Sequence, residues 1–257
     1  MSGLTISCAG LEAGWPPDPP ALALDRLELA PGAVTAVVGP SGSGKSTLGH
    51  AFTGLLPWLG ARVRGTVRFG ERAVDPGRAV EWREVRGRLV RWIPQDPSAS
   101  FTPTRPLLPQ MLETGRERSP LSGRLNELLA AVGLPAAAEL AGRRPFELSG
   151  GELQRAAAVS AFGAEPALVV ADEPTAHLDP PRALSVARVV SELAQRTGTG
   201  LLWITHDLRM AAALADRIIH LSGGRITADG SPAELLDPEA AESLPLVTAS
   251  QRLAARP

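Results

Sequence analysis

The sequence predicts an α/β protein with a mostly parallel sheet, and three observations carry that prediction. Short continuous apolar runs, which are typical of buried parallel strands, occur at 33–39, 167–172 and 201–207. Between the last two runs, a stretch with Pro181 in its first turn extends to Gln195 and predicts a helix, because proline favours the first helical turn. Strands that alternate with helices are joined by right-handed crossovers, which build a parallel sheet.

Other segments add antiparallel and helical parts. Residues 21–30 have leucines at alternate positions with one slip, which predicts a half-buried strand. Residues 62–70 predict a further strand, which we expect at an antiparallel edge. The stretch from about 98 to 160 has helix-prone sequence, proline and glycine punctuation and no strand pattern. We therefore expect a helical insertion there.

The sequence near the end of the chain predicts one more helix, and the tail that follows has no pattern that predicts a structure. Ser231 is followed three residues later by Glu234, the spacing of a capping box at a helix start. A length of 257 residues suits one large domain or two small ones. With no internal repeat and no low-complexity linker, we expect a single domain at 1–236 and a C-terminal tail at 237–257.

Composition excludes several classes of protein. Hydrophobic residues make up 44% of the chain and charged residues 21%, close to the average for soluble globular proteins. The formal charge of −1 gives no global field for nucleic acid, so we expect no nucleic-acid partner. Cys8 is the only cysteine, which excludes a disulfide framework and favours the cytoplasm. No secretory leader and no apolar span long enough for a bilayer are visible, so we expect any membrane role to act through a partner.

The segment 39–47 reads GPSGSGKST and matches the phosphate-binding loop pattern between a predicted strand and a predicted helix. Its glycines let backbone N–H groups turn towards phosphates, and the helix N-terminus adds positive potential. Lys45, the only lysine among 26 basic residues, is expected to reach the β- and γ-phosphates as a catalytic group, and Ser46 to ligate Mg²⁺. A glycine-rich turn with an ordinary surface lysine is the alternative. The loop residues expected to bind the nucleotide are Gly39, Ser41, Gly42, Ser43, Gly44, Lys45, Ser46 and Thr47.

Two carboxylates follow the apolar run at 167–172. Asp172 ends the predicted strand, which places it at the carboxyl edge of the sheet beside the phosphate-binding loop, where it can hold the magnesium shell. Glu173 points elsewhere and is a candidate for polarising an attacking water. Alternatively, the pair only caps the turn that follows the strand.

The sequence LSGGELQR at 148–155 combines a helix start with two glycines. Ser149 and Glu152 have capping-box spacing, which is a complete structural explanation. Each glycine nevertheless costs about 1 kcal/mol relative to alanine in a helix, so two in succession are expected where a backbone approaches a ligand closely. Because the phosphate-binding loop already holds phosphates, the anion at this helix N-terminus would belong to a second copy of the protein.

The phosphate-binding loop, LSGGELQR, the DEP strand and WITHD at 203–207 resemble, in the same order, the motifs of the ATPase subunits of ATP-binding cassette (ABC) transporters. The resemblance covers the chain to about residue 236. It implies a P-loop NTPase core with a mostly parallel sheet, an N-terminal antiparallel β-subdomain and an inserted helical subdomain. It also implies hydrolysis of ATP with Mg²⁺ in a head-to-tail dimer. Each ATP would lie between one subunit's phosphate-binding loop and the other's Ser149, Gly150 and Gly151.

The same resemblance implies roles for individual residues. Asp172 would serve Mg²⁺, and Glu173 would be the catalytic base. His206 would contact the γ-phosphate, although a lone histidine here is more often a hydrogen-bonded residue at a helix start. Gln95, in WIPQDP, would sense Mg²⁺ and the attacking water, as a catalytic, nucleotide-binding and metal-binding residue. Asp179 would lie in the loop that crosses the dimer interface beside the nucleotide.

Trp15 matches the aromatic residue that stacks on adenine in this family. Tryptophan is a good stacking surface, and the chain contains no tyrosine. The alternative is a tryptophan that covers the edge of the core.

Two positions depart from the family pattern. Glu152 stands where glutamine is usual, and its charge would oppose a γ-phosphate unless the carboxylate turns back onto the Ser149 amide. His177 stands where a small residue is more usual, and we interpret it as tolerated variation.

Short loops extend the resemblance to importers of dipeptides, oligopeptides and nickel, namely GLLP at 54–57, the strand at 61–70 and QDPSASFTP at 95–103. Such an importer implies membrane permease subunits, a second ATPase subunit and an extracytoplasmic solute-binding protein. The chain is then expected at the cytoplasmic face of the cell membrane. Residues 95–104 would form a groove for a permease segment, with Phe101 either an exposed contact or an anchor of the loop.

Other functions stay open at this point. The chain would otherwise be the ATPase of an ABC exporter or of a soluble ABC machine. Soluble ABC machines usually have two cassettes in one chain or a long coiled coil within the cassette, and a chain of 257 near-neutral residues suits neither arrangement. A third alternative is a catalytically impaired ATP-binding partner in a heterodimer. Glu173 and His206 argue against impairment, whereas Glu152 leaves room for it.

Overall fold

Two sheets organise the computed structural model, which describes residues 3–113, 121–176 and 178–236. An antiparallel sheet has the order β2-β1-β4-β5 and a larger sheet has the order β10-β9-β3-β8-β7-β6. The first contains β1 (Ile6–Gly14), β2 (Leu22–Leu29), β4 (Arg62–Phe69) and β5 (Arg72–Val74). The second contains β3 (Val34–Val38), β6 (Val90–Ile93), β7 (Leu168–Asp172), β8 (Gly200–Ile204), β9 (Arg217–Ser222) and β10 (Arg225–Gly230). Its neighbours pair in parallel except β10, which is antiparallel to β9.

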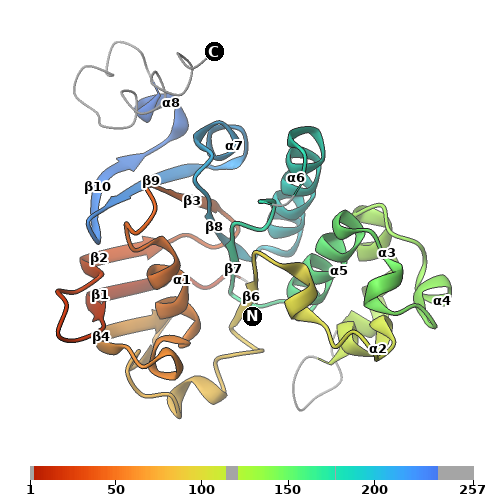
Figure 1. Cartoon of the computed structure of the whole chain (residues 1–257), viewed down its shortest axis with the longest axis horizontal. Coiled ribbons are helices and arrows are strands. Elements are labelled where there is room, and N and C mark those ends of the chain that lie inside the picture. Colours follow the sequence, from red (N-terminus) through yellow and green to blue (C-terminus); the bar gives the residue numbers. More distant parts are fainter. Residues whose placement is uncertain (1–2, 114–120, 177, 237–257) are drawn as a thin grey trace.

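Helices cover both faces of the larger sheet (Figure 1). The longer ones are α1 (Lys45–Thr53), α3 (Leu121–Ala131), α5 (Gly150–Phe162), α6 (Pro180–Thr197) and α7 (Leu208–Leu214). The shorter ones are α2 (Leu107–Leu112), α4 (Ala137–Leu140) and α8 (Pro232–Leu235), with 3₁₀ turns η1 (Leu56–Leu59), η2 (Glu81–Arg83), η3 (Pro97–Ser100) and η4 (Pro145–Glu147). Figure 1 shows α2 to α5 gathered on one side of the molecule and the antiparallel sheet on the other.

Alternation along the central strands divides the core into two large clusters. On β8, Leu202 and Ile204 face α1 and the antiparallel sheet, whereas Leu201 and Trp203 face α5 and α6. Gly49 lets α1 lie close to the strands, because a Cβ there would come within 2.8 Å of Ile204 Cδ1. The helix that follows the phosphate-binding loop is therefore packed between two sheets, which fixes the position of the loop.

The predicted fold class is confirmed, and so are most of the predicted elements. The runs at 33–39, 167–172 and 201–207 form β3, β7 and β8 in parallel, and the predicted helix from Pro181 forms α6. Among the described residues from 98 to 160, the regular elements are helices and 3₁₀ turns. The tail at 237–257 lies outside the described residues.

The edge position predicted for residues 62–70 is wrong. They form β4, which pairs with β1 on one side and with β5 on the other, so it lies inside the antiparallel sheet. The sequence did not indicate β5, because three residues are too few for an alternating pattern. The prediction also omitted β9, although its IIHL run is as apolar as those of the neighbouring strands.

Cys8 provides a probe of this fold. It lies on β1 with 2% of its surface exposed, and burial raises the pKa of its thiol to about 12. Because the thiolate is the reactive form, we expect the folded protein to resist a thiol reagent at pH 8 and the urea-unfolded chain to react at the rate of a free cysteine. Labelling followed by mass spectrometry measures this, and rapid modification of the folded protein would contradict the burial of β1.

Candidate functional site

The phosphate-binding loop joins β3 to α1 and has a backbone that requires glycine. Gly39 has φ 152°, and a Cβ there would lie 2.1 Å from the carbonyl oxygen of Leu221 on β9. Gly44 has φ 99°, and its Cβ would lie 2.5 Å from the carbonyl oxygen of Ala21. No other residue adopts these dihedrals without strain or fits against these carbonyls. The loop is thus held from two sides by neighbouring backbone.

Lys45 lies inside this loop with 7% of its surface exposed. Its Nζ donates hydrogen bonds to the carbonyl oxygens of Gly39, at 2.9 Å, and Pro40, at 2.8 Å. Burial lowers the pKa of Lys45, and the charges of Glu173 and Asp172 oppose that effect. Ser43 Oγ is also buried in the loop and has no hydrogen-bond partner among the described residues. An ammonium and an unpaired hydroxyl in one loop suit the oxygens of a phosphate.

Asp172 and Ser46 are brought together as the sequence predicts. The Ser46 hydroxyl donates a hydrogen bond to Asp172, which ends β7. Burial raises the pKa of Asp172, and the Ser46 hydrogen bond partly offsets that rise. The described residues contain no cluster of three or more His, Cys, Asp or Glu side chains that could hold a metal ion. The hydroxyl and carboxylate together fit Mg²⁺, which usually takes one or two protein oxygens and completes its shell with substrate phosphates and water.

Glu173 and His206 also meet, at the ends of β7 and β8. Glu173 has φ 44°, an uncommon conformation for a non-glycine residue, and its N–H donates to the carbonyl oxygen of Ile204 at 2.9 Å. Its Oε1 lies 3.1 Å from Nδ1 of His206. Since a carboxylate only accepts, the imidazole carries its proton on Nδ1 in this contact. The left-handed turn therefore gives the two adjacent carboxylates different partners.

Gln95 lies exposed just beyond the end of β6. Its strand is the neighbour of β7, with Ile93 opposite Ala171, so Gln95 leaves the same edge of the sheet as Asp172. Among the described residues, no hydrogen bond joins Gln95 to Ser46 or Asp172. Gln95 thus leaves the sheet at the same edge as Asp172, and its role in sensing Mg²⁺ stays a prediction.

Trp15 follows β1 and lies at the surface with 38% of its area exposed. Its Nε1 donates a hydrogen bond to the carbonyl oxygen of Leu59 at 2.9 Å. This bond ties the loop after β1 to η1 and fixes the orientation of the indole. Adenine stacking by Trp15 stays a prediction.

The LSGGELQR helix start is exposed and capped. Ser149 is the N-cap of α5, and Glu152 Oε2 accepts hydrogen bonds from the Ser149 N–H at 2.8 Å and from its hydroxyl at 2.7 Å. The hydrogen bonds from Ser149 lower the pKa of Glu152. The Glu152 carboxylate therefore turns back onto the Ser149 amide. From the sequence, we expected the charge of Glu152 to oppose a γ-phosphate unless the side chain adopts this orientation.

No close contact within the chain requires glycine at the two positions that follow Ser149. A Cβ at Gly150 would meet nothing within 4 Å, and one at Gly151 only Arg155 Nη1 at 3.6 Å. Neither glycine has a positive φ. Unlike Gly39 and Gly44, they are not needed for the fold of this chain, which favours a close approach by something outside it.

Asp179 is the N-cap of α6, where its side chain accepts a hydrogen bond from the Arg182 N–H at 3.2 Å. Asp179 is exposed and has a structural role that the sequence analysis did not assign. His177, in the same loop, lies outside the described residues.

The burial of Phe101 decides between the two roles left open for it, an exposed contact or an anchor of its loop. The side chain is 6% exposed and packs in the core cluster with Leu107 and Met111, so it anchors the loop. The expectation that it is an exposed contact for a partner is wrong.

Sequence reasoning missed the support that the β9–β10 turn gives to the phosphate-binding loop. The Gly224 N–H donates to the carbonyl oxygen of Ser43 at 3.0 Å. His220, on β9 opposite Val38, has Nδ1 2.6 Å from Thr227 Oγ1, and burial is the main cause of its lowered pKa, with the charge of Lys45 adding to it. Only the fold brings these residues next to Lys45.

A family model described as ABC transporter matches residues 24–176. The chain belongs to the ABC transporter family. The resemblance drawn from its motifs is confirmed. The matched residues include the phosphate-binding loop, the LSGGELQR helix start and the DEP strand.

Curated relatives include transport proteins for peptides. The probable D,D-dipeptide transport ATP-binding protein DdpD of Escherichia coli is 35% identical over 82% of this chain and 66% of its own length. The oligopeptide transport ATP-binding protein OppD of Bacillus subtilis is 35% identical over 82% of this chain and 60% of its own length. The chain thus spans less than two thirds of the length of either relative.

Solved structures share the fold. The structure of cbiO1 from Clostridium perfringens, part of the ABC transporter complex cbiONQ, is 22% identical with a TM-score of 0.75 and covers 96% of this chain and 98% of its own. In the described part of this chain, every helix is too short or too polar to cross a bilayer.

Proposed function

We propose that the chain is the ATP-hydrolysing subunit of an ABC importer that takes up peptides. The observation that carries the proposal is the convergence of Lys45, Ser46, Asp172, Glu173 and His206 at one edge of the sheet. The peptide substrate is supported by the relatives, whose printed names refer to dipeptide and oligopeptide transport. Nickel or a metal chelate is the second candidate cargo, since the loops at 54–57 and 95–103 are similar to those of both importer groups.

The reaction would be phosphoryl transfer from ATP to water, which depends mainly on positioning and electrostatic stabilisation. Loop N–H groups and the Lys45 ammonium hold the phosphates, and Trp15 stacks on adenine. Glu173 orients the attacking water and accepts its proton, while His206 contacts the γ-phosphate. Mg²⁺, held by Ser46 and Asp172 and sensed by Gln95, would neutralise charge on the β- and γ-phosphates.

A head-to-tail dimer would complete the site. Because Gly150 is exposed, Gly151 is partly exposed and neither packs tightly within the chain, the start of α5 can approach the nucleotide of a second ATPase subunit, identical or different. Ser149 and Asp179 would lie at that interface. Binding of ATP from both sides favours the closed dimer, and hydrolysis removes the bridge.

The remaining partners follow from this role. Residues 1–236 would form one ATPase domain, with a helical subdomain at about 98–160, that binds membrane permease subunits through the groove at 95–104. An extracytoplasmic solute-binding protein would deliver the peptide. The chain would then lie at the cytoplasmic face of the cell membrane.

Glu173→Gln tests the proposed reaction. Loss of the carboxylate should reduce MgATP hydrolysis at least a hundredfold while nucleotide binding continues, because a positioned general base typically contributes 10²–10⁴-fold. The variant should accumulate as a dimer in MgATP, and cells that carry it should not accumulate labelled dipeptide. Glu192→Gln, an exposed change on α6, is the control. Hydrolysis and dipeptide uptake at the wild-type rate in the Glu173 variant would refute the assignment.

Glu152→Gln tests whether α5 faces a phosphate. The amide oxygen can still accept from the Ser149 N–H, but the negative charge near the helix N-terminus is lost. A charge at this position contributes about 0.3–1 kcal/mol, so the MgATP concentration for half-maximal hydrolysis should fall by roughly two- to fivefold. Glu147→Gln is the matched control, because the Glu147 carboxylate accepts a hydrogen bond in the same way, from the N–H of Arg144 at the start of η4. An unchanged or higher half-maximal concentration for Glu152→Gln would argue against the shared site.

A further inference from the structure

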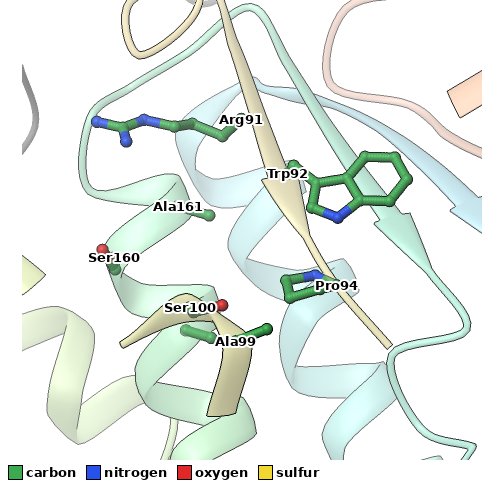
Figure 2. Close-up of a pocket in the computed structure, with 8 residues that line it drawn as sticks. Arg91, Trp92, Pro94, Ala99, Ser100, Ser160 and Ala161 are labelled. Atoms are coloured by element: carbon green, nitrogen blue, oxygen red, sulfur yellow. The ribbon is translucent and has the colours of Figure 1, made fainter. Parts of the chain in front are cut away.

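Trp58 is the most exposed tryptophan of the chain, with 69% of its surface exposed against 38% for Trp15. Trp82 and Trp203 are buried. Figure 2 shows Trp92 turned away from the pocket between β6, η3 and α5, and its ring stacks against α1 instead. One exposed aromatic side chain needs no explanation by itself, so the neighbours of Trp58 decide whether it belongs to an interaction surface.

The turns η1 and η2 lie close together. The guanidinium of Arg86, which follows η2, lies over the ring of Trp58 in η1, 5.9 Å from the ring centroid. A Cβ at Gly54, between α1 and η1, would come within 2.1 Å of the ring of Trp82 in η2. These two contacts place the exposed side chains of η1 beside the segment that contains η2.

Three large apolar side chains are exposed on these two segments. Trp58 and Leu59 lie in η1, where Leu59 is 50% exposed, and Val80 immediately precedes η2 and is 66% exposed. Across the described parts of the chain, only two other large apolar side chains are exposed, those of Trp15 and Phe146. Exposed apolar side chains are thus concentrated on one part of the surface, which is typical of a site that binds a partner.

The same region has an excess of positive charge. Residues 58–90 contain eight arginines and four acidic residues, whereas the formal charge of the whole chain is −1. Two of the acidic residues form ion pairs there, Glu81 with Arg78 and Glu84 with Arg72. Three further arginines lie near the exposed apolar side chains in sequence and have no acidic partner among the described residues, namely Arg62, Arg83 and Arg86.

The η1–η2 surface is the name that we give to the set Trp58, Leu59, Arg62, Val80, Arg83 and Arg86. Its composition matches the interface of an anionic bilayer. Tryptophan is favoured at the level of the lipid headgroups, and aliphatic side chains enter the boundary of the acyl chains. Arginine keeps its guanidinium at the phosphates while its stem lies along apolar surface. Each arginine near an anionic membrane adds to binding without one fixed partner.

A bilayer fits this arrangement better than a protein segment does. The three unpaired guanidinium groups come from separate segments, namely the start of β4, η2 and the stretch that follows η2. A protein partner would have to place an acidic group opposite each of them, whereas a bilayer presents phosphates across its whole surface. The phosphate-binding loop precedes α1 and η1 follows it, so about 13 Å of helix separates the lipid contact from the nucleotide site.

We propose that the η1–η2 surface binds directly to the anionic lipids of a bilayer. Trp58, Leu59 and Val80 enter the headgroup region, and the guanidinium groups donate to lipid phosphates. This inference goes beyond the proposed function and does not depend on it, because neither ATP hydrolysis nor a permease takes part in the contact.

Flotation of the purified chain with protein-free vesicles tests the contact. The chain should float with vesicles of phosphatidylglycerol and phosphatidylcholine, stay behind with vesicles of phosphatidylcholine alone, and be released by added salt. The double variant Arg62→Glu and Arg83→Glu should partition onto the anionic vesicles at least about tenfold more weakly, and so should Trp58→Ser with Leu59→Ser. The serine at 59 keeps the backbone carbonyl that accepts the Trp15 hydrogen bond.

Two matched controls lie elsewhere on the surface. Phe146→Ser, at the exposed phenylalanine of η4, and Arg188→Glu, at an exposed arginine of α6, should partition within about twofold of the original chain. Each variant must keep Cys8 protected from thiol labelling, which separates a lost lipid contact from misfolding.

Three results would overturn the inference: no flotation with the anionic vesicles, equal flotation with the neutral ones, or undiminished partition of both double variants. Neutral vesicles that contain the permease provide a further arm. If the chain floats only with these and both double variants abolish that binding, the η1–η2 surface binds protein and the inference fails. None of these results depends on ATP hydrolysis, so they are distinguishable from a failure of the proposed function.

Discussion

The phosphate-binding loop depends on a backbone that only glycine allows. Gly39 and Gly44 have positive φ and pack directly against the carbonyl oxygens of Leu221 and Ala21, so the loop has one shape, set by β9 and by the start of β2. That shape encloses Lys45 and orients the first turn of α1. Because α1 is fixed between two sheets, the ammonium, the Ser46 hydroxyl and the helix N-terminus all have fixed positions relative to the ends of β7 and β8.

The second feature of the site is the separation of two adjacent carboxylates. Asp172 ends its strand beside Ser46, and the left-handed backbone at Glu173 turns the next side chain to His206. Local backbone strain often occurs at functional sites, and the positive φ of Glu173 lies within the proposed one.

Much of this could be predicted from the sequence, because phosphate-binding loops, helix caps and buried parallel strands depend on short-range patterns. The Ser149–Glu152 capping box is of this kind, and the phosphate-binding loop and the β7 strand are two such patterns whose parallel arrangement brings Ser46 and Asp172 together. Features set by distant segments could not be predicted. Phe101 is buried in a core cluster that includes residues of α2 and α5, and β4 lies inside its sheet because β5 pairs with it.

Titration of MgATP into the protein and into Lys45→Ala tests the central claim most directly, since the chain has no other lysine to substitute. Hydrogen bonds to charged groups contribute about 1.5–3 kcal/mol, so calorimetry should find one site per chain and at least a tenfold weaker affinity in the variant. Protection of Cys8 from labelling shows that the variant is folded. Equal affinity in a folded Lys45→Ala protein would contradict the account.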